Sequence, residues 1–225
     1  MSLYHPLAQL GFDPVYQAVL LAALLLFLSG WLVRRQIAAT QGGVVPDEGV
    51  TVRNALELIV EGLSHLARDN MGPDWRRWFP FVGTIFFFIL ISNLLGLVPG
   101  VGGATANVNT TTAWAIISFA LYNYVGIRTH GWKYIKQFLG PIPALAWFFL
   151  LLEPPLHLAR ILTLSVRLLA NMFADHTVVS VWLLLVPFAI PAVFMGLGLI
   201  VAVLQAFVFA LLTMVYIGLA VEEAH

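Results

Sequence analysis

Residues 153–176 read EPPLHLARILTLSVRLLANMFADH, and this stretch decides how the rest of the chain must be arranged. Apolar runs flank it, ALAWFFLLL before it and TVVSVWLLLVPFAIPAVFMGLGLIVAVL after it. Arg160 and Arg167 therefore fall in a region that has the apolar character of a membrane interior. An ionisable side chain at the centre of a bilayer costs about 2.5 to 3.5 kcal/mol on insertion scales. Both arginines need a structural or functional reason.

Polar side chains of this stretch share one stripe of a helix that turns by about 100° per residue. Within about 40° of one direction lie Glu153, His157, Arg160, Arg167, Asn171 and Asp175. Leucine and isoleucine cover much of the remaining surface, so the stripe faces something other than lipid. From Glu153 to Arg167 the helix rises by roughly 21 Å, most of a hydrocarbon core of about 30 Å. The pattern predicts a polar path through a membrane.

The composition indicates an integral membrane protein, because 60% of the residues are hydrophobic, 10% are charged and the mean hydropathy is +0.92. The formal net charge is zero, so nothing points to nucleic acid as a partner. There is no cysteine, which excludes disulfides, thiolate catalysis and cysteine-bound metals. We expect no metal and no cofactor. The first 14 residues lack Lys and Arg, so we expect the first apolar run to be kept as a spanning helix.

The apolar runs and their turn signals predict an all-α integral membrane protein with a single polytopic domain over residues 1–225. Transmembrane helices are expected at about 16–33, 79–98 and 109–127, and an amphipathic helix in the membrane interface at about 48–71. Two long helices follow, at about 144–186 and 191–222, and the first is longer than the roughly 20 residues of a perpendicular span. It must be tilted or broken, and Pro154 and Pro155 favour an early break.

The positions of the charges predict an orientation. All Lys and Arg except Arg160 and Arg167 lie within residues 34–77 or 128–136, which the predicted spans place on one side. The positive-inside tendency makes that side cytoplasmic, with the N-terminus outside and the C-terminus in the cytoplasm. On the last helix Gln205, Tyr216 and Glu223 share one face. If the two long helices are antiparallel neighbours, the two polar stripes meet.

Two C-terminal stretches carry a resemblance to a known family. SVRLLANMFADH followed by LQAFVFALLTMVYIGLAVEEAH resembles the two C-terminal helices of subunit a of the F-type rotary ATP synthase, in which an essential arginine lies in a motif close to R-L-x-x-N and a glutamine in L-Q-A-F/Y-V/I-F. Upstream, VRNALELIVEGL is similar to that family's interfacial helix, NLLGLVPG to the end of its second span and TANVNTTTAWA to the start of its third. The resemblance covers nearly the whole chain.

The resemblance implies a proton-translocating stator subunit in a bacterial inner membrane, with no active site of its own. Its implied partners are a ring of c subunits, the b-subunit stalk, the rest of the ATP synthase complex and membrane lipid. Two offset half-channels would carry protons to and from a carboxylate on the ring. Arg167 would face that carboxylate, favour its ionised form because a guanidinium stays charged, and repel a proton that passes directly between the half-channels.

The resemblance also implies roles for other residues. The outer half-channel would be lined by Asn171, Asp175, His176 and Gln205, with Asn107 and Asn109 at its mouth. The cytoplasmic half-channel would be lined by Glu153, His157, Arg160 and Thr163, and the proton pathway would include Tyr216 and Glu223. Gln205 is expected to contact Arg167 and hold it toward the ring. The chain departs from the family at Gly198, where a number of members have an ionisable residue, and at Asn107, where some have Asp. We expect Asp175 to take the place of the missing group at 198.

Other readings of these residues stay open. Arg160 could pair with Glu153, His157 could form an interhelical hydrogen bond, and Tyr216 could belong to an interfacial aromatic belt. Asn109 is as good a candidate for a helix N-cap as for a water ligand.

The alternative functions are a proton-coupled secondary transporter and another subunit of a membrane complex. The transporter class usually shows internal repeats, which this chain lacks. A haem anchor through His157 and His176 is disfavoured, because the two side chains point about 100° apart on one helix.

Overall fold

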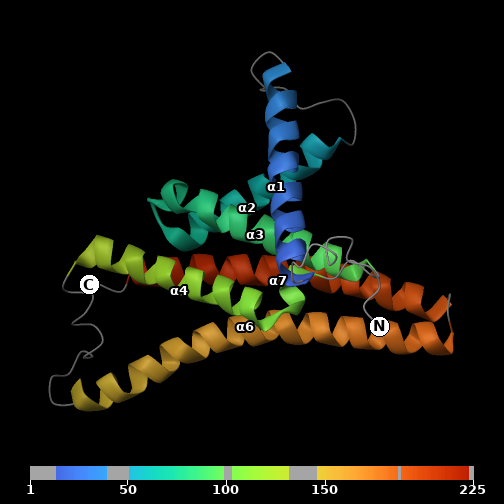
Figure 1. The fold of residues 1–225 in the computed structure, drawn as a ribbon. Coiled ribbons are helices and arrows are strands. Elements are labelled where there is room, and N and C mark those ends of the chain that lie inside the picture. Colours follow the sequence, from blue (N-terminus) through green and yellow to red (C-terminus); the bar gives the residue numbers. More distant parts are fainter. Residues whose placement is uncertain (1–13, 40–50, 99–102, 132–145, 187–188, 223–225) are drawn as a thin grey trace.

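The computed structural model describes residues 14–39, 51–98, 103–131, 146–186 and 189–222, and within these ranges it contains helices and no strand. The helices are α1 (Pro14–Ala39), α2 (Val52–Met71), α3 (Trp75–Leu97), α4 (Val108–His130), α6 (Ala146–Leu185) and α7 (Ala189–Glu222), with a short 3-10 turn, η2 (Ala104–Ala106), before α4. The two long helices, α6 and α7, lie side by side, and α1 stands crosswise to them and packs against α3 (Figure 1). The all-helical fold predicted from the sequence is confirmed.

Four of the described helices are long and apolar enough to span a membrane. They comprise Val15–Ala38, Trp75–Leu97, Ala159–Leu185 and Ala189–Glu222. Helix α4, at the position of the predicted span 109–127, is not among them. It carries hydroxyl groups on its packed face, with Thr111, Ser118 and Tyr122 all buried against neighbouring helices. These polar groups lower the hydropathy of α4, and its place in the membrane stays a prediction.

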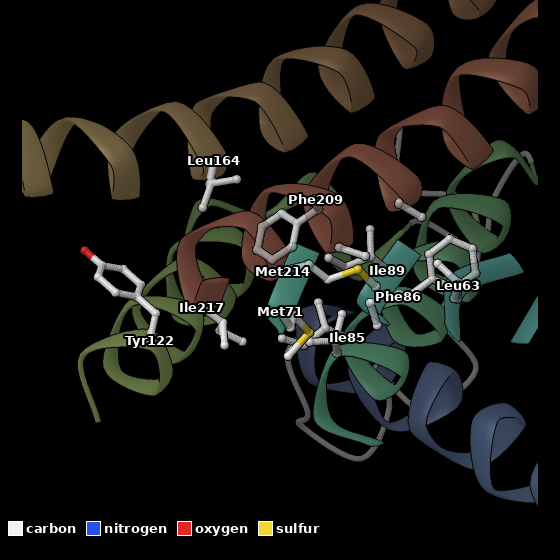
Figure 2. Packing of buried hydrophobic residues seen from close by; sticks show 14 of the residues in the cluster. Leu63, Met71, Ile85, Phe86, Ile89, Tyr122, Leu164, Phe209, Met214 and Ile217 are labelled. Atoms are coloured by element: carbon white, nitrogen blue, oxygen red, sulfur yellow. The ribbon is translucent and has the colours of Figure 1, made fainter. Parts of the chain in front are cut away.

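The hydrophobic core lies where α2, α3, α4 and α7 meet, with α6 closing one side. Leu63 and Met71 of α2 pack with Ile85, Phe86 and Ile89 of α3 and with Phe209, Met214 and Ile217 of α7 (Figure 2). Small residues on the packed face of α7 allow its neighbours to come close. These are Gly198, Ala202, Ala206, Ala210 and Gly218. At Gly218 the backbone carbonyl of Asn70 comes so close that a Cβ could not fit.

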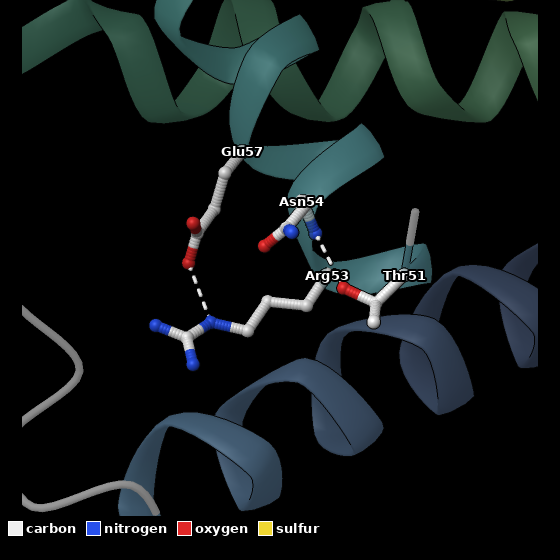
Figure 3. A network of polar contacts seen from close by, with 4 residues as sticks. All are labelled: Thr51, Arg53, Asn54 and Glu57. Carbon is white, nitrogen blue, oxygen red and sulfur yellow. Dashed lines mark hydrogen bonds and ion pairs between the residues drawn. The ribbon is translucent and has the colours of Figure 1, made fainter. Parts of the chain in front are cut away.

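Helix α2 starts with a side-chain cap and an ion pair. Thr51 Oγ1 accepts a hydrogen bond of 3.2 Å from the backbone N–H of Asn54, and Arg53 Nε donates to Glu57 Oε1 at 2.8 Å (Figure 3). Arg53 is fully buried, although the sequence pattern places it on the polar face of an amphipathic helix. The opposite face exposes Leu58, and the helix ends at Gly72, whose φ of 72° favours glycine. Residues 48–50, the predicted start of this helix, lie outside the described residues.

Helix α6 is continuous from Ala146 to Leu185, so the early break predicted at Pro154 and Pro155 is wrong. Each proline removes one N–H donor from the helix, but the turns on either side hold the chain in a helical path. The helix bends along its length instead of breaking (Figure 1). As a result, Arg160 and Arg167 belong to one uninterrupted helix.

Candidate functional site

Arg167 lies in the middle of α6 with its side chain exposed. Its neighbours Leu164 and Leu168 are buried in the core, and they are 4% and 1% exposed. Val166 and Phe173 are exposed on the outer surface of the helix. Within the part of the chain that the structure describes, Arg167 forms no ion pair. The structure therefore presents an uncompensated cation on an apolar outer surface.

Helix α7 runs antiparallel to α6, and its Gln205 forms a hydrogen bond with a polar residue of α6. Asn171 lies one turn after Arg167, and its Nδ2 donates a hydrogen bond of 2.8 Å to Oε1 of Gln205. Gln205 is buried and Asn171 is half-buried. The two polar stripes expected from the sequence thus meet at this point. The hydrogen bond of Gln205 is made to Asn171, and its contact with Arg167 stays a prediction.

One turn further along α6, Asp175 lies against the bare backbone of Gly198 on α7. A Cβ placed on Gly198 would be 3.6 Å from Cγ and from Oδ2 of Asp175, and 2.7 Å from Cδ2 of Leu97. The carboxyl group of Asp175 therefore borders the space that a side chain at position 198 would use. That Asp175 takes the place of a group missing at position 198 stays a prediction.

Two cavities adjoin Asp175. The larger has a volume of about 400 Å³, and its lining includes Asp175, His176, Thr177 and Ser180. The smaller, of about 10 Å³, is lined among others by Asn171, Asp175 and Gln205, and it has room for about one water molecule. Nε2 of His176 is buried and has no hydrogen-bond partner in the described part of the chain. A series of polar groups thus leads from the larger cavity toward the turn that carries Arg167.

On the other side of Arg167, Arg160 turns toward α7 and α4. Its guanidinium carbon lies 5.0 Å from the centroid of the Tyr216 ring, a cation–π geometry, and the Tyr216 ring lies 5.8 Å from that of Tyr122. Tyr216 is half-buried against these groups. The exposed Thr163 donates its hydroxyl to the backbone carbonyl of Arg160 at 3.0 Å. Arg160 is therefore accommodated by aromatic rings.

The remaining predicted residues lie at the ends of the pathway. Asn107 is the N-cap of α4, because its Oδ1 accepts a hydrogen bond of 2.8 Å from the backbone N–H of Asn109. The alternative in which Asn109 is the N-cap is therefore wrong. Glu153 and His157 belong to α6, but their side chains lie outside the described residues, as does the whole of Glu223. Among the described residues, no three His, Cys, Asp or Glu side chains cluster in a way that could hold a metal ion.

The comparison with known proteins decides the family. The sequence profile of the family described as "ATP synthase A chain" matches residues 16–218. The chain belongs to the ATP synthase A chain family. It is 42% identical over 204 residues to "ATP synthase subunit a 1" of Syntrophotalea carbinolica, covering 90% of this chain and 84% of that protein. It is 40% identical over 226 residues to "ATP synthase subunit a" of Geotalea uraniireducens, covering 100% and 95%. The resemblance stated from the sequence is confirmed.

Within the described residues of this family member, several buried polar contacts between helices were not revealed by the sequence. Ser165 of α6 lies at hydrogen-bond distance from both Thr111 and Thr112 of α4. Thr213 of α7 donates its hydroxyl to that of Ser118 of α4 at 3.4 Å.

Another buried polar contact joins α3 to α7 and η2. Asn93 of α3 donates to the backbone carbonyl of Ala202 at 3.2 Å and accepts from the Thr105 hydroxyl at 2.7 Å. The one available signal was the row of hydroxyl residues at helical spacing in α4, from Thr111 to Tyr122.

Proposed function

We propose that this chain is the proton-translocating stator subunit of an F-type ATP synthase, in which Arg167 faces the carboxylate of a rotating ring of c subunits. The observation that carries the proposal is the exposed, unpaired guanidinium of Arg167 on an apolar outer surface, within the part of the chain described. A permanent cation in hydrocarbon requires an anionic partner or access to water. A carboxylate on a neighbouring subunit meets that requirement, and the guanidinium would in turn favour the ionised form of that carboxylate.

The outer half-channel begins at the cavity of about 400 Å³ that His176 and Asp175 line. A proton that enters this cavity reaches two titratable groups side by side. The smaller cavity next to Asp175 leads on to Asn171 and Gln205, whose hydrogen bond lies one turn from Arg167. Titratable side chains joined by water are what a proton relay through a membrane requires.

Arg167 acts at the end of this relay as a fixed positive charge. When a protonated ring carboxylate arrives, the guanidinium favours its ionised form, and the proton leaves toward the opposite half-channel. The same charge repels a proton that moves directly between the two half-channels. Because Arg is not deprotonated at any relevant pH, the barrier to a leak is permanent. Proton flow is then coupled to movement of the ring.

The cytoplasmic half-channel follows α6 on the N-terminal side of Arg167. Glu153, His157, Arg160 and Thr163 occupy successive turns of this part of the helix, and Tyr216 and Glu223 complete the pathway from α7. The position of Arg160 over the Tyr216 ring supports this part of the proposal, because it brings a residue of α6 and a residue of α7 from the proposed pathway into contact. Asn107 and Asn109 stand at the opposite end, at the mouth of the outer half-channel.

The assembly that we propose places α6 and α7 against the c ring, α2 in the membrane interface and the b-subunit stalk against another face. A hollow of about 730 Å³ between α1, α2 and α3 offers a mostly apolar surface for a further membrane helix, with Glu57 and Glu61 among its lining residues. We place the subunit in a bacterial inner membrane, surrounded by lipid, with its N-terminus outside and its C-terminus in the cytoplasm.

The test uses the whole ATP synthase in membrane vesicles, with Arg167→Lys and Arg167→Gln variants and Arg128→Gln as the matched control. Arg128 is an exposed arginine at the end of α4 whose guanidinium donates to the hydroxyl of Tyr124. We expect ATP-driven proton pumping and ATP synthesis to be lost in both Arg167 variants, while the Arg128 variant keeps the parent rates. Synthesis of ATP at the parent rate by an Arg167 variant would refute the proposal.

A further inference from the structure

Three hydroxyl groups meet in the packed interface between α4 and α6. Oγ of Ser165 lies 3.1 Å from Oγ1 of Thr111 and 3.0 Å from Oγ1 of Thr112. Ser165 is 5% exposed and Thr111 is fully buried. Thr111 Oγ1 also lies 3.0 Å from the backbone carbonyl oxygen of Val108, which orients this hydroxyl. Ser165, Thr111 and Thr112 are called the hydroxyl cluster below.

Ser165 and Arg167 belong to the same helix, so the direction of one side chain around the axis of α6 fixes the direction of the other. The two residues are two positions apart, and so they point about 200° apart around the helix. The structure agrees, because Ser165 is buried against α4 whereas Arg167 is exposed on the outer surface. Any rotation of α6 about its axis that moves Ser165 away from α4 also turns Arg167 away from its outward direction.

The apolar contacts of α6 define its rotation less sharply than the hydroxyl cluster does. Leu164 and Leu168 are buried on the same side as Ser165, but apolar burial has no preferred direction. Hydrogen bonds between hydroxyls require defined distances and angles, and in a membrane interior water is not present to replace them. A further hydrogen bond, from Asn171 to Gln205, holds α6 against α7 one turn after Arg167.

We propose that the hydroxyl cluster is a positioning device, which fixes the rotation of α6 and thereby aims Arg167 out of the subunit. Thr111, Thr112 and Ser165 act through Arg167 and do not touch the transported proton. The proposal rests on the function proposed above for Arg167. It also gives α4 a role in coupling, since two of the three hydroxyls belong to that helix.

The first measurement is proton pumping by the whole ATP synthase in membrane vesicles. The variant Thr111→Val with Thr112→Val removes both α4 hydroxyls and keeps the side-chain shape, and Thr111→Ser with Thr112→Ser keeps them. Thr129→Val is the control, because Thr129 also belongs to α4 but donates its hydroxyl to the carbonyl of Val125 in its own helix at 2.9 Å. We expect the valine pair to lower the pumping rate about tenfold, since displacing a catalytic group by 1 Å can cost up to 100-fold. The serine pair and the control should keep the parent rate.

The second measurement reports the rotation itself. The chain has no cysteine, so spin labels can be attached at Val166→Cys on α6 and Ile116→Cys on α4, two exposed positions. We expect a narrow distance distribution between the labels in the otherwise unchanged chain and in the serine pair. The distribution should broaden or shift in the valine pair. Thr112→Val alone, at a half-buried position, serves as a milder variant if the valine pair does not assemble.

The two measurements distinguish failure of the positioning role of the hydroxyl cluster from failure of the function proposed for Arg167. An unchanged distance distribution in the valine variants, or pumping at the control rate, would overturn the positioning role while leaving the function of Arg167 intact. If Arg167→Lys pumps normally, the proposed function fails. The distance measurement would still show whether the hydroxyl cluster sets the rotation of α6, because it does not depend on pumping.

Discussion

The carboxyl group of Asp175 on α6 lies against the bare backbone of Gly198 on α7. A Cβ at position 198 would lie 3.6 Å from Cγ of Asp175. The two positions therefore share one site across the helix pair, and a carboxyl group placed on either helix would reach it. This relationship leads to the first prediction.

Moving the carboxyl group across the helix pair should preserve function. We expect Asp175→Gly to lower ATP-driven proton pumping about 100-fold, the order of magnitude of a lost general acid–base group. Adding Gly198→Asp should restore much of the rate, provided that Leu97→Ala makes room, because the new Cβ would lie 2.7 Å from Cδ2 of Leu97. Leu97→Ala alone is the control. A triple variant that pumps no better than Asp175→Gly would contradict a shared site.

His176 should be needed for proton uptake from the larger cavity. Its Nε2 is buried without a partner among the described residues, and its side chain lines the cavity. We expect His176→Phe to lower the initial pumping rate about tenfold or more, because an apolar ring removes one relay group. His176→Gln, which keeps a polar group, should retain more activity. Equal rates in the two variants would show that polarity at this position is unimportant.

The hydrogen bond between Asn171 and Gln205 should show measurable coupling. We predict a coupling free energy of about 0.6 kcal/mol in a double-mutant cycle of Asn171→Leu and Gln205→Leu, the average for interhelical hydrogen bonds within a membrane protein. The free energy of unfolding in mixed detergent micelles is the quantity to measure. Additive effects of the two substitutions would mean that the 2.8 Å contact contributes nothing to stability.

Gly218 should tolerate no side chain. A Cβ at this position would collide with the backbone carbonyl of Asn70, and backbone cannot rotate aside as a side chain can. We expect Gly218→Ala to destabilise the protein by about 1 to 3 kcal/mol, as overpacking does. Gly196→Ala on the same helix meets nothing within 4 Å and should be neutral or slightly stabilising. Thermal unfolding of the two variants side by side checks the prediction.

The most predictable feature of this molecule was which side chains share a face of one helix. The stripe on α6 and the place of Gln205 on α7 follow from the helical repeat, and the structure joins them through Asn171. The break predicted at Pro154 and Pro155 was wrong, because α6 continues through both residues. Each proline removes one backbone hydrogen-bond donor, but the intact turns on either side keep this part of the chain helical. The burial of Arg53 could not be foreseen, since a helical repeat shows which residues share a face but not what covers that face.

The hydroxyl cluster was unpredictable for a related reason. Ser165 reads as an ordinary small residue in an apolar helix, and Thr111 and Thr112 belong to a polar run at the start of another helix. Only the packing of α4 on α6 brings the three oxygens together. The role that we propose for the cluster depends on the angle between Ser165 and Arg167 around the axis of α6. That angle can be interpreted only when it is known which helix packs against Ser165 and that Arg167 is exposed.

The close approach of Asn70 and Gly218 bears on how the polypeptide is built. Helix α2 leaves the ribosome long before α7 is synthesised, yet its C-terminal end fits only against the glycine of that last helix. During biogenesis α2 must therefore remain without this neighbour until α7 has been synthesised.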